Sequence, residues 1–352
     1  SANDVPANHY ILIQPAVNLP LNGTWYISAR AGLASSDGSH QIVEGRLDYI
    51  GSIYAFKVEQ IYPRNNYDTE LGIVIRHNKS HLNLEFENEK LEPLISVSPA
   101  PADLAIHTEN YQIRLSGSFE YGVSCEGAIS DGIIANDSTQ LTQSYKDKVT
   151  FTPNDGFITY PAFTSTQNAT GHRRFDVKTG NLTGLRTRVK KLEGRDLILA
   201  LREYSDNYEG WGEKQTLPFA SVPGQQIYDE FRDAEASVDK TETIALDWDN
   251  LTGSVSTGAF YLCSEGQSAT REKLSVGVQS LIQLTDIGLA WKQSSDGTLI
   301  YAFSLKSGTP ISGLTLRLIN NDAATLIEAI TDAGGVAQID AAAYGETEER
   351  LY

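Results

Sequence analysis

The sequence predicts an all-β protein built from tandem antiparallel β-sandwiches, and three observations lead to that class. Apolar and polar residues alternate with period two along most of the 352-residue chain, as in strands that bury one face. Helical periodicity is scarce, and residues 225–237 are the one segment for which we expect a short helix. A pattern of strand, glycine and Asp-Gly turn occurs twice, ending at Gly38 and at Gly132, which indicates modules of about 100 residues.

The expected strands share the alternation of the first one. Residues 24–33 (TWYISARAGL) place Trp25, Ile27 and Ala29 on one face. The same spacing recurs, with turn residues between the segments, in residues 71–77, 81–87, 110–123, 280–291, 298–305 and 314–320. Such segments are typical of half-buried antiparallel strands.

Near the C-terminus the sequence predicts a hairpin and the start of another strand. LTLRLI (residues 314–319) and TLIEAI (residues 325–330) are the two strands, because the NNDA between them tolerates left-handed backbone. In the TDAGG turn that follows, we expect Asp332 to accept hydrogen bonds from backbone amides. Gly334 and Gly335 can take positive φ there.

Turn clusters and shifts in composition divide the chain into four expected modules. The first, residues 1–57, is short, and we expect it to be incomplete, with its N-terminal strands missing. Residues 58–147 form the second. Residues 148–265 form the third, and residues 266–352 form the fourth, which we expect to be truncated at its C-terminus. The Gly/Ser/Thr-rich residues 263–273 (CSEGQSATREK) are expected to link the last two modules.

Charge and composition argue against several classes of function. Lys plus Arg number 28 against 45 Asp plus Glu, a net charge of −17, so nucleic acid and anionic membrane surfaces would be repelled. No apolar run approaches the ~20 residues that span a bilayer, and no signal peptide is visible. Cys125 and Cys263 are too few for a disulfide framework and fall in different modules, so we expect buried free thiols.

Residues that could carry chemistry are sparse. A nucleophilic triad needs His beside Asp and a Ser or Cys, yet the 6 histidines are scattered and no G-x-S-x-G is present. His77 and His81 lie four residues apart, a spacing that binds metal on a helix, but we expect a hairpin turn there. No sequence motif indicates the paired carboxylates of a glycosidase. We therefore assign no catalytic, cofactor-binding or metal-binding residue.

One acidic segment offers oxygen ligands. Asp247, Asp249 and Asn250 lie in DWDNLTG, but a Ca²⁺ loop of the EF type needs more ligands and a distal Glu. We expect a strand that ends in an Asx turn instead.

A second segment is both aromatic and acidic. Residues 202–214 (REYSDNYEGWGEK) would form a carbohydrate platform if Tyr204, Tyr208 and Trp211 were exposed and coplanar. The more ordinary expectation is a loop whose aromatic rings cap the core of a sandwich.

The C-terminal part of the chain resembles the bacterial alpha-2-macroglobulin family. TDIGL at residues 285–289, the strand ending in residues 307–318 and TDAGGVA at residues 331–337 follow the order and spacing of the family's macroglobulin-like domains. The resemblance covers residues 148–340 and extends more loosely before them. It implies macroglobulin/fibronectin-III-like β-sandwich domains.

The resemblance also implies a function, that of a broad-range protease inhibitor. In that family a protease cuts a bait segment, the protein rearranges, and a thioester made from the Cys and Gln of C-x-E-Q holds the attacker. In CSEGQ, Gln267 follows Cys263 by one position too many, so we expect a coincidence of letters. The chain is then expected to be an N-terminal scaffold fragment, without enzymatic activity, that lacks the bait region and the thioester domain.

Further expectations come with the family. They are proteases as partners of the full-length protein, a Gram-negative periplasmic location, a lipoprotein tether to the inner membrane, a monomeric state, no cofactor and a role in host defence. The alternative is a cell-surface adhesive or carbohydrate-binding stalk, which an exposed aromatic platform or calcium at domain junctions would favour. An accessory β-sandwich region of a glycosidase is a third and weaker alternative.

Overall fold

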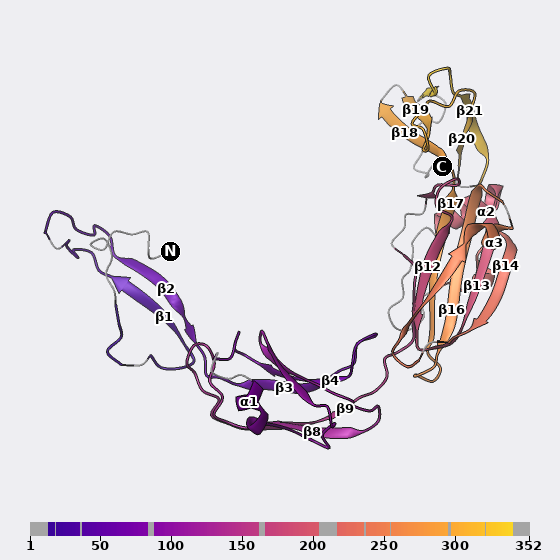
Figure 1. Ribbon diagram of the computed structural model, residues 1–352. Coiled ribbons are helices and arrows are strands. Elements are labelled where there is room, and N and C mark those ends of the chain that lie inside the picture. Colours follow the sequence, from indigo (N-terminus) through magenta and orange to yellow (C-terminus); the bar gives the residue numbers. More distant parts are fainter. Residues whose placement is uncertain are drawn as a thin grey trace. The chain divides into compact units, whose positions relative to one another are not determined.

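The fold is all-β with antiparallel sheets, as predicted. The computed structural model describes residues 13–17, 19–35, 37–83, 88–161, 166–203, 217–235, 237–253, 255–294, 297–320 and 322–340. The chain divides into two compact units, residues 1–64 with 70–152 and residues 65–69 with 153–352 (Figure 1). The finer division into four modules remains a prediction.

The first unit begins with a two-stranded ribbon. Strand β1 (Gly23–Ala29) pairs antiparallel with β2 (Arg46–Ile53). The rings of Tyr26 and Tyr49 meet edge to face across the pair, with centroids 5.7 Å apart. Both rings are more than half exposed, because a ribbon alone buries little surface.

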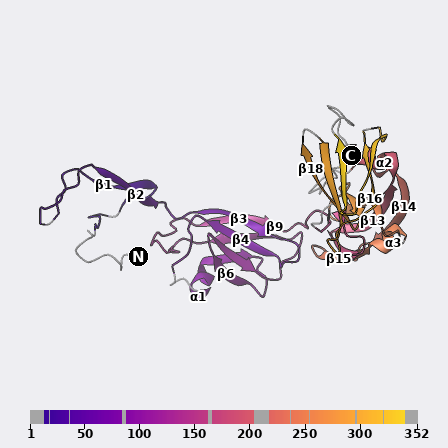
Figure 2. The ribbon, with the colours of Figure 1, turned by 90° about the horizontal axis from the view of Figure 1, so that it is seen from above.

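The rest of the first unit is a sandwich of two sheets. The four-stranded sheet has the order β3 (Val58–Arg64), β4 (Gly72–His77), β7 (Gln112–Ser116), β6 (Ala105–Glu109). The three-stranded sheet has the order β5 (Ile95–Ser98), β8 (Ser124–Ile129), β9 (Tyr145–Thr150). The short helices α1 (Asn88–Leu91) and η2 (Glu92–Leu94) lead into β5, and α1 lies beside β6 (Figure 2). Alternate apolar residues of both sheets form the core, among them Ile73, Ile75, Ile113, Leu115 and Cys125.

The end of β4 is both buried and polar. His77 is 1% exposed, and its ring lies edge-on to Phe56 with centroids 5.4 Å apart. Burial lowers the pKa of His77 to about 4, so the imidazole is neutral at physiological pH. Next to it, the buried Lys79 ammonium donates to the Tyr54 carbonyl at 2.6 Å and pairs with Asp137 at 2.7 Å.

The second unit contains a larger sandwich. Its five-stranded sheet has the order β11 (Thr166–Gln167), β17 (Ser275–Leu284), β16 (Gly258–Ser268), β13 (Leu182–Leu192), β14 (Gln225–Asp233). The facing sheet has the order β10 (Phe157–Thr159), β12 (Arg174–Gly180), β15 (Thr241–Asp247). The short β11–β17 pair is parallel, and the other pairs in these two sheets are antiparallel. The core between the sheets includes Val177, Val189, Phe260, Leu262 and Val278.

Two local predictions are wrong here. Residues 225–237 do not form a helix, because β14 (Gln225–Asp233) pairs along its length with β13. Residues 263–273 are not a linker, because β16 continues to Ser268 in the middle of the sheet and Cys263 is fully buried. In both segments, pairing within the sheet prevailed over local composition.

The outer face of the five-stranded sheet carries a second, smaller core. Helix α2 (Gly194–Glu203) and the 3-10 turn η3 (Phe219–Ser221) contribute to it, and with the sheet they bury Leu192, Ala200, Phe219, Tyr261, Cys263 and Leu281. The Gln279 amide makes two hydrogen bonds to the backbone of Leu217. Arg188 pairs with Glu265, and its guanidinium lies 4.1 Å from the centroid of Phe219.

A buried cluster of hydrogen-bonded polar groups joins distant segments of the second unit. Asp239 is 4% exposed and accepts from the backbone N–H of Asn154 and the side-chain amide of Asn181. Its carbonyl accepts from the N–H of Asp68, in the segment 65–69, at 2.9 Å. Asn181 and Asp239 have φ of 49° and 54°, a left-handed backbone that Asn and Asp tolerate.

The C-terminal strands confirm the predicted hairpin and turn. Strands β18 (Ile287–Ser294), β19 (Gly297–Ser304) and β22 (Val336–Asp340) form one sheet, and β20 (Thr315–Ile319) pairs with β21 (Thr325–Ile330). Asp332 accepts from the N–H groups of Gly334 and Val336, both at 2.9 Å. Gly335 takes a positive φ of 76°, whereas Gly334 does not.

Two further predictions concern the whole chain. Cys125 and Cys263 are both free and buried, as predicted. Burial raises the pKa of the Cys125 thiol, which keeps it protonated. Within the described ranges, no helix has the length and apolar character needed to cross a membrane.

Acid should destabilise the first unit through His77. The pKa of this histidine is about 4 in the folded state against 6.5 for an unperturbed side chain, so the unfolded state binds more protons between these values. The free energy of unfolding should therefore fall as pH drops through that window, by up to about 3 kcal/mol for this group. Urea unfolding at a series of pH values should show this component in the wild type and not in His77→Asn. The same pH dependence in both proteins would contradict the assignment.

Breaking the buried Arg188–Glu265 pair should cost far more than breaking an exposed one. Their side chains are 15% and 16% exposed, so Glu265→Ala leaves a guanidinium that is neither paired nor hydrated. We expect the free energy of unfolding to fall by about 2–4 kcal/mol. Glu328→Ala is the matched control, because the Arg317–Glu328 pair is more than half exposed, and it should cost less than about 0.5 kcal/mol. Equal losses in the two variants would show that burial does not strengthen the Arg188–Glu265 pair.

Candidate functional site

The inner face of β14 is polar where a sandwich strand is ordinarily apolar. Tyr228, Glu230 and Arg232 occupy alternate positions and face the second sheet. Their neighbours across the β13 ladder are core positions, with Thr187 opposite Glu230 and Leu185 opposite Arg232. Three polar side chains therefore point toward the facing sheet, and Glu230 and Arg232 remain exposed because β14 is an edge strand.

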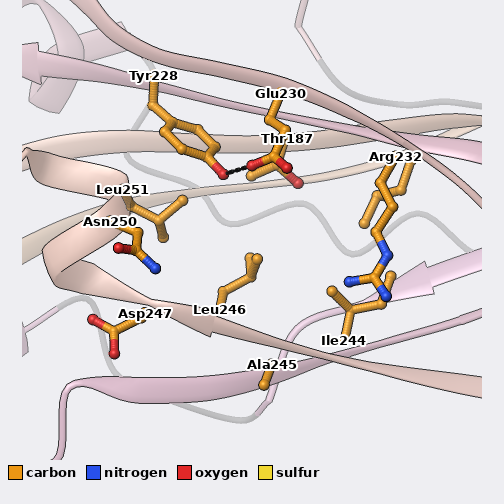
Figure 3. A pocket seen from close by; sticks show the side chains of 11 residues that line it. Thr187, Tyr228, Glu230, Arg232, Ile244, Ala245, Leu246, Asp247, Asn250 and Leu251 are labelled. Carbon is orange, nitrogen blue, oxygen red and sulfur yellow. Dashed lines mark hydrogen bonds between the residues drawn. The ribbon is translucent and has the colours of Figure 1, made fainter.

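These side chains line a pocket between the edges of the two sheets, which we call the β14 pocket (Figure 3). Its volume is about 160 Å³. Residues from four elements line it: Leu185 and Thr187 of β13, Tyr228, Glu230 and Arg232 of β14, residues 244–247 of β15, and Asn250 and Leu251 of helix α3 (Trp248–Thr252). Figure 3 shows the β14 side chains on one side, with Leu246 and Ile244 opposite them.

The polar groups of the β14 pocket are arranged by hydrogen bonds and charge. The Tyr228 hydroxyl donates to the Glu230 carboxylate. Burial and this carboxylate raise the pKa of Tyr228 to about 12, so the hydroxyl stays a donor at neutral pH. The Arg232 guanidinium lies 3.9 Å from Glu242, a loose contact that leaves half of the Arg232 side chain exposed.

Behind the pocket, a chain of hydroxyls runs into the core. The hydroxyls of Thr187 and Ser264 are 3.0 Å apart, and the Tyr160 hydroxyl donates to Ser264 at 2.9 Å. Tyr160 lies deep in the core, and burial raises its pKa well above the usual value. These three hydroxyls satisfy one another and are protonated at physiological pH.

The acidic segment at one end of the pocket forms the predicted Asx turn. Asp247 ends β15 and caps helix α3 by accepting from the N–H of Asp249 at 2.8 Å. That hydrogen bond and the nearby Arg174 lower the pKa of Asp247. Asp249 pairs with Arg173 at 2.8 Å and Asp247 with Arg174 at 3.1 Å, so each carboxylate has an arginine partner.

The other candidates from the sequence do not converge on one site. Cys263 and Gln267 lie on one extended strand, where four residues span about 13 Å, so they cannot meet in a thioester. His77 ends β4 in the core, whereas His81 is exposed. In the part of the chain that the structure describes, no group of three or more His, Cys, Asp or Glu residues is placed to hold a metal ion. Tyr204, Tyr208 and Trp211 lie outside the described residues.

Sequence reasoning missed the β14 pocket because it expected a helix over residues 225–237. A signal was present all the same. With the segment taken as a strand, Tyr228, Glu230 and Arg232 share one face, and Phe231 falls on the other face, where its ring covers Gly184. In a sandwich strand the inward face is ordinarily apolar, so an alternation that places polar residues on that face marks a candidate site.

Comparison with known proteins gives one domain match. Residues 284–351 match the family model described as the bacterial alpha-2-macroglobulin MG3 domain. Comparison with curated proteins finds no match.

Solved structures give a match of fold. The crystal structure of native alpha-2-macroglobulin from Escherichia coli spanning domains MG0-NIE-MG1 has a TM-score of 0.54 and 15% identity, over 81% of this chain and 90% of that chain. The cryo-EM reconstruction of native E. coli alpha-2-macroglobulin gives 0.48 and 14%, and Salmonella alpha-2-macroglobulin reacted with methylamine gives 0.42 and 15%. This chain covers 81% and 84% of its own length in these two comparisons, and 18% of each of the longer chains. At 15% identity the first comparison establishes a shared fold.

The hydroxyl chain behind the pocket should contribute measurably to stability. Thr187→Val keeps the shape of the side chain but leaves Ser264 without one of its partners, so the free energy of unfolding should fall by about 1 kcal/mol. Thr183→Val, at an exposed position of the same strand, should leave stability within about 0.3 kcal/mol of the wild type. Chemical denaturation of the three proteins tests this, and equal stability of wild type and Thr187→Val would contradict it.

Proposed function

We propose that this chain, which carries an MG3 domain of the bacterial alpha-2-macroglobulin family, supplies scaffold domains to a broad-range protease trap. The match of residues 284–351 to the family model is the observation that carries the proposal. The fold shared with the E. coli MG0-NIE-MG1 structure supports the same relationship for most of the chain.

The architecture suits a mechanical role. The sandwich of the first unit and the larger sandwich of the second have separate hydrophobic cores. Because each buries its own strand faces, each keeps its shape when its neighbours in the full-length protein move. Bait cleavage and thioester chemistry would take place in other domains, so we assign no catalytic residue to this chain.

The family relationship also supports a setting for the proposed trap. We place the full-length protein in the periplasm of a Gram-negative bacterium, tethered to the inner membrane by a lipoprotein anchor. It would act as a monomer, with attacking proteases as its partners and host defence as its role.

A protease inhibition assay tests the proposal. The 352-residue chain alone should leave the caseinolytic activity of trypsin unchanged at one molar equivalent, because it would hold neither bait nor thioester. The full-length gene product should lower that activity, and it should do so for several proteases of unrelated specificity.

Two outcomes would refute the proposal. Complete inhibition by the chain alone at one equivalent would place the inhibitory chemistry within it. Failure of the full-length protein against every protease of the panel would exclude a trap. Active-site-blocked trypsin, incubated in parallel, controls for simple association without cleavage.

A further inference from the structure

The inward face of β14 breaks the pattern that the rest of the sandwich follows. Glu230 and Arg232 point between the sheets, while Phe231 faces outward and is 62% exposed. Placing Phe231 inside and the charged residues outside would need a shift of one position and would follow the usual alternation. A strand that turns two ionisable groups toward the facing sheet breaks a local rule at the place where a pocket opens, as functional sites often do. Because β14 is an edge strand, both groups remain exposed to solvent.

Two of the charged residues that line the β14 pocket, Glu230 and Arg232, have no close ion-pair partner among the described residues. Glu230 accepts from the neutral Tyr228 hydroxyl, and no cation pairs with its carboxylate among the residues that the structure describes. Arg232 has only the loose 3.9 Å contact with Glu242. The backbone positions of Glu230 and Arg232 are about 7 Å apart along one face of the strand. One carboxylate and one guanidinium therefore both border the pocket and can reach a ligand there.

The opposite wall is apolar. Ile244, Leu246 and Leu251 face the β14 side chains across the pocket (Figure 3). The volume of about 160 Å³ lies below the range of ~300–1,000 Å³ typical of pockets for drug-sized ligands. Such a pocket suits a small molecule with one positive group, one negative group and an apolar body.

We propose that the β14 pocket binds a free α-amino acid whose side chain is apolar and about the size of leucine. The α-carboxylate pairs with the Arg232 guanidinium, whose planar fork matches a carboxylate. The α-ammonium donates to the Glu230 carboxylate and to the Tyr228 oxygen. The side chain lies on Ile244, Leu246 and Leu251. Because one carbon joins the two charged groups of an α-amino acid, the ligand fits between neighbouring inward positions of one strand.

Methyl NMR titration with L-leucine tests the proposal on the 352-residue chain. The methyl resonances of Ile244, Leu246 and Leu251 should shift with a Kd on the order of 1 mM, as a small ligand with two charge contacts allows. Leucinamide lacks the carboxylate and 4-methylpentanoate lacks the ammonium, so each should bind at least about tenfold more weakly. These two probes also separate a free amino acid from either terminus of a peptide.

Matched variants assign the two charged contacts. Glu230→Gln and Arg232→Gln should each weaken leucine binding at least about tenfold, with unchanged circular dichroism. Asp233→Asn, one position away on the outward face of β14, and Arg195→Gln, on helix α2, should bind as the wild type does.

Three outcomes would overturn the proposal. They are the absence of any methyl shift at about 20 mM leucine, wild-type binding by either pocket variant, or equal binding of one of the two analogues. Inward charges can also protect an edge strand from pairing with another chain. A variant that carries both Glu230→Gln and Arg232→Gln tests this alternative. If it self-associates and the wild type binds no leucine, the two charges protect the edge strand and do not bind a ligand.

Discussion

Burial of one face of each strand between two sheets is the constraint on which both sandwiches depend. In the first unit it places the fully buried Ile73, Ile75, Ile113 and Leu115 opposite the strands β5, β8 and β9. In the second unit, burial of strand faces forms the core between the five-stranded and three-stranded sheets. Because the inner faces of the sheets are used for packing, charged and polar side chains can cluster in only two other places. These are the outer face, where Arg188 lies against Phe219 and pairs with Glu265, and the edge, where β14 opens the pocket.

The same constraint explains which parts of the fold could be predicted. Alternation with period two identified the hairpin of β20 and β21, and the chemistry of Asp332 and Gly335 identified the turn that follows. It failed at residues 225–237, where the spacing of Ile227, Phe231 and Ala234 suits a helix locally but pairing with β13 decides the outcome. It failed again at residues 263–273, where Gly, Ser and Thr suggested a linker. Small polar residues also suit a central strand whose neighbours supply the apolar bulk.

Even with residues 225–233 recognised as a strand, most of the candidate site could not have been predicted from the sequence. Its lining comes from β13, β14, β15 and α3, and only the topology of the two sheets brings these segments to one edge. The local part of the site was within reach, since Asp247 was expected in an Asx turn and caps helix α3. The meeting of Glu230 and Arg232 with Ile244 and Leu246 depends on pairing between residues distant in the chain, which no local pattern encodes.

The placement of the two thiols has a practical use. The chain holds 2 cysteines, Cys125 in the core of the first unit and Cys263 beneath the layer formed by α2 and η3 in the second. Neither can meet a water-soluble alkylating reagent until its own surroundings open, because both are buried. Mass spectrometry of the labelled peptides would therefore measure the rate of local opening in each unit separately, in one sample and without an engineered probe.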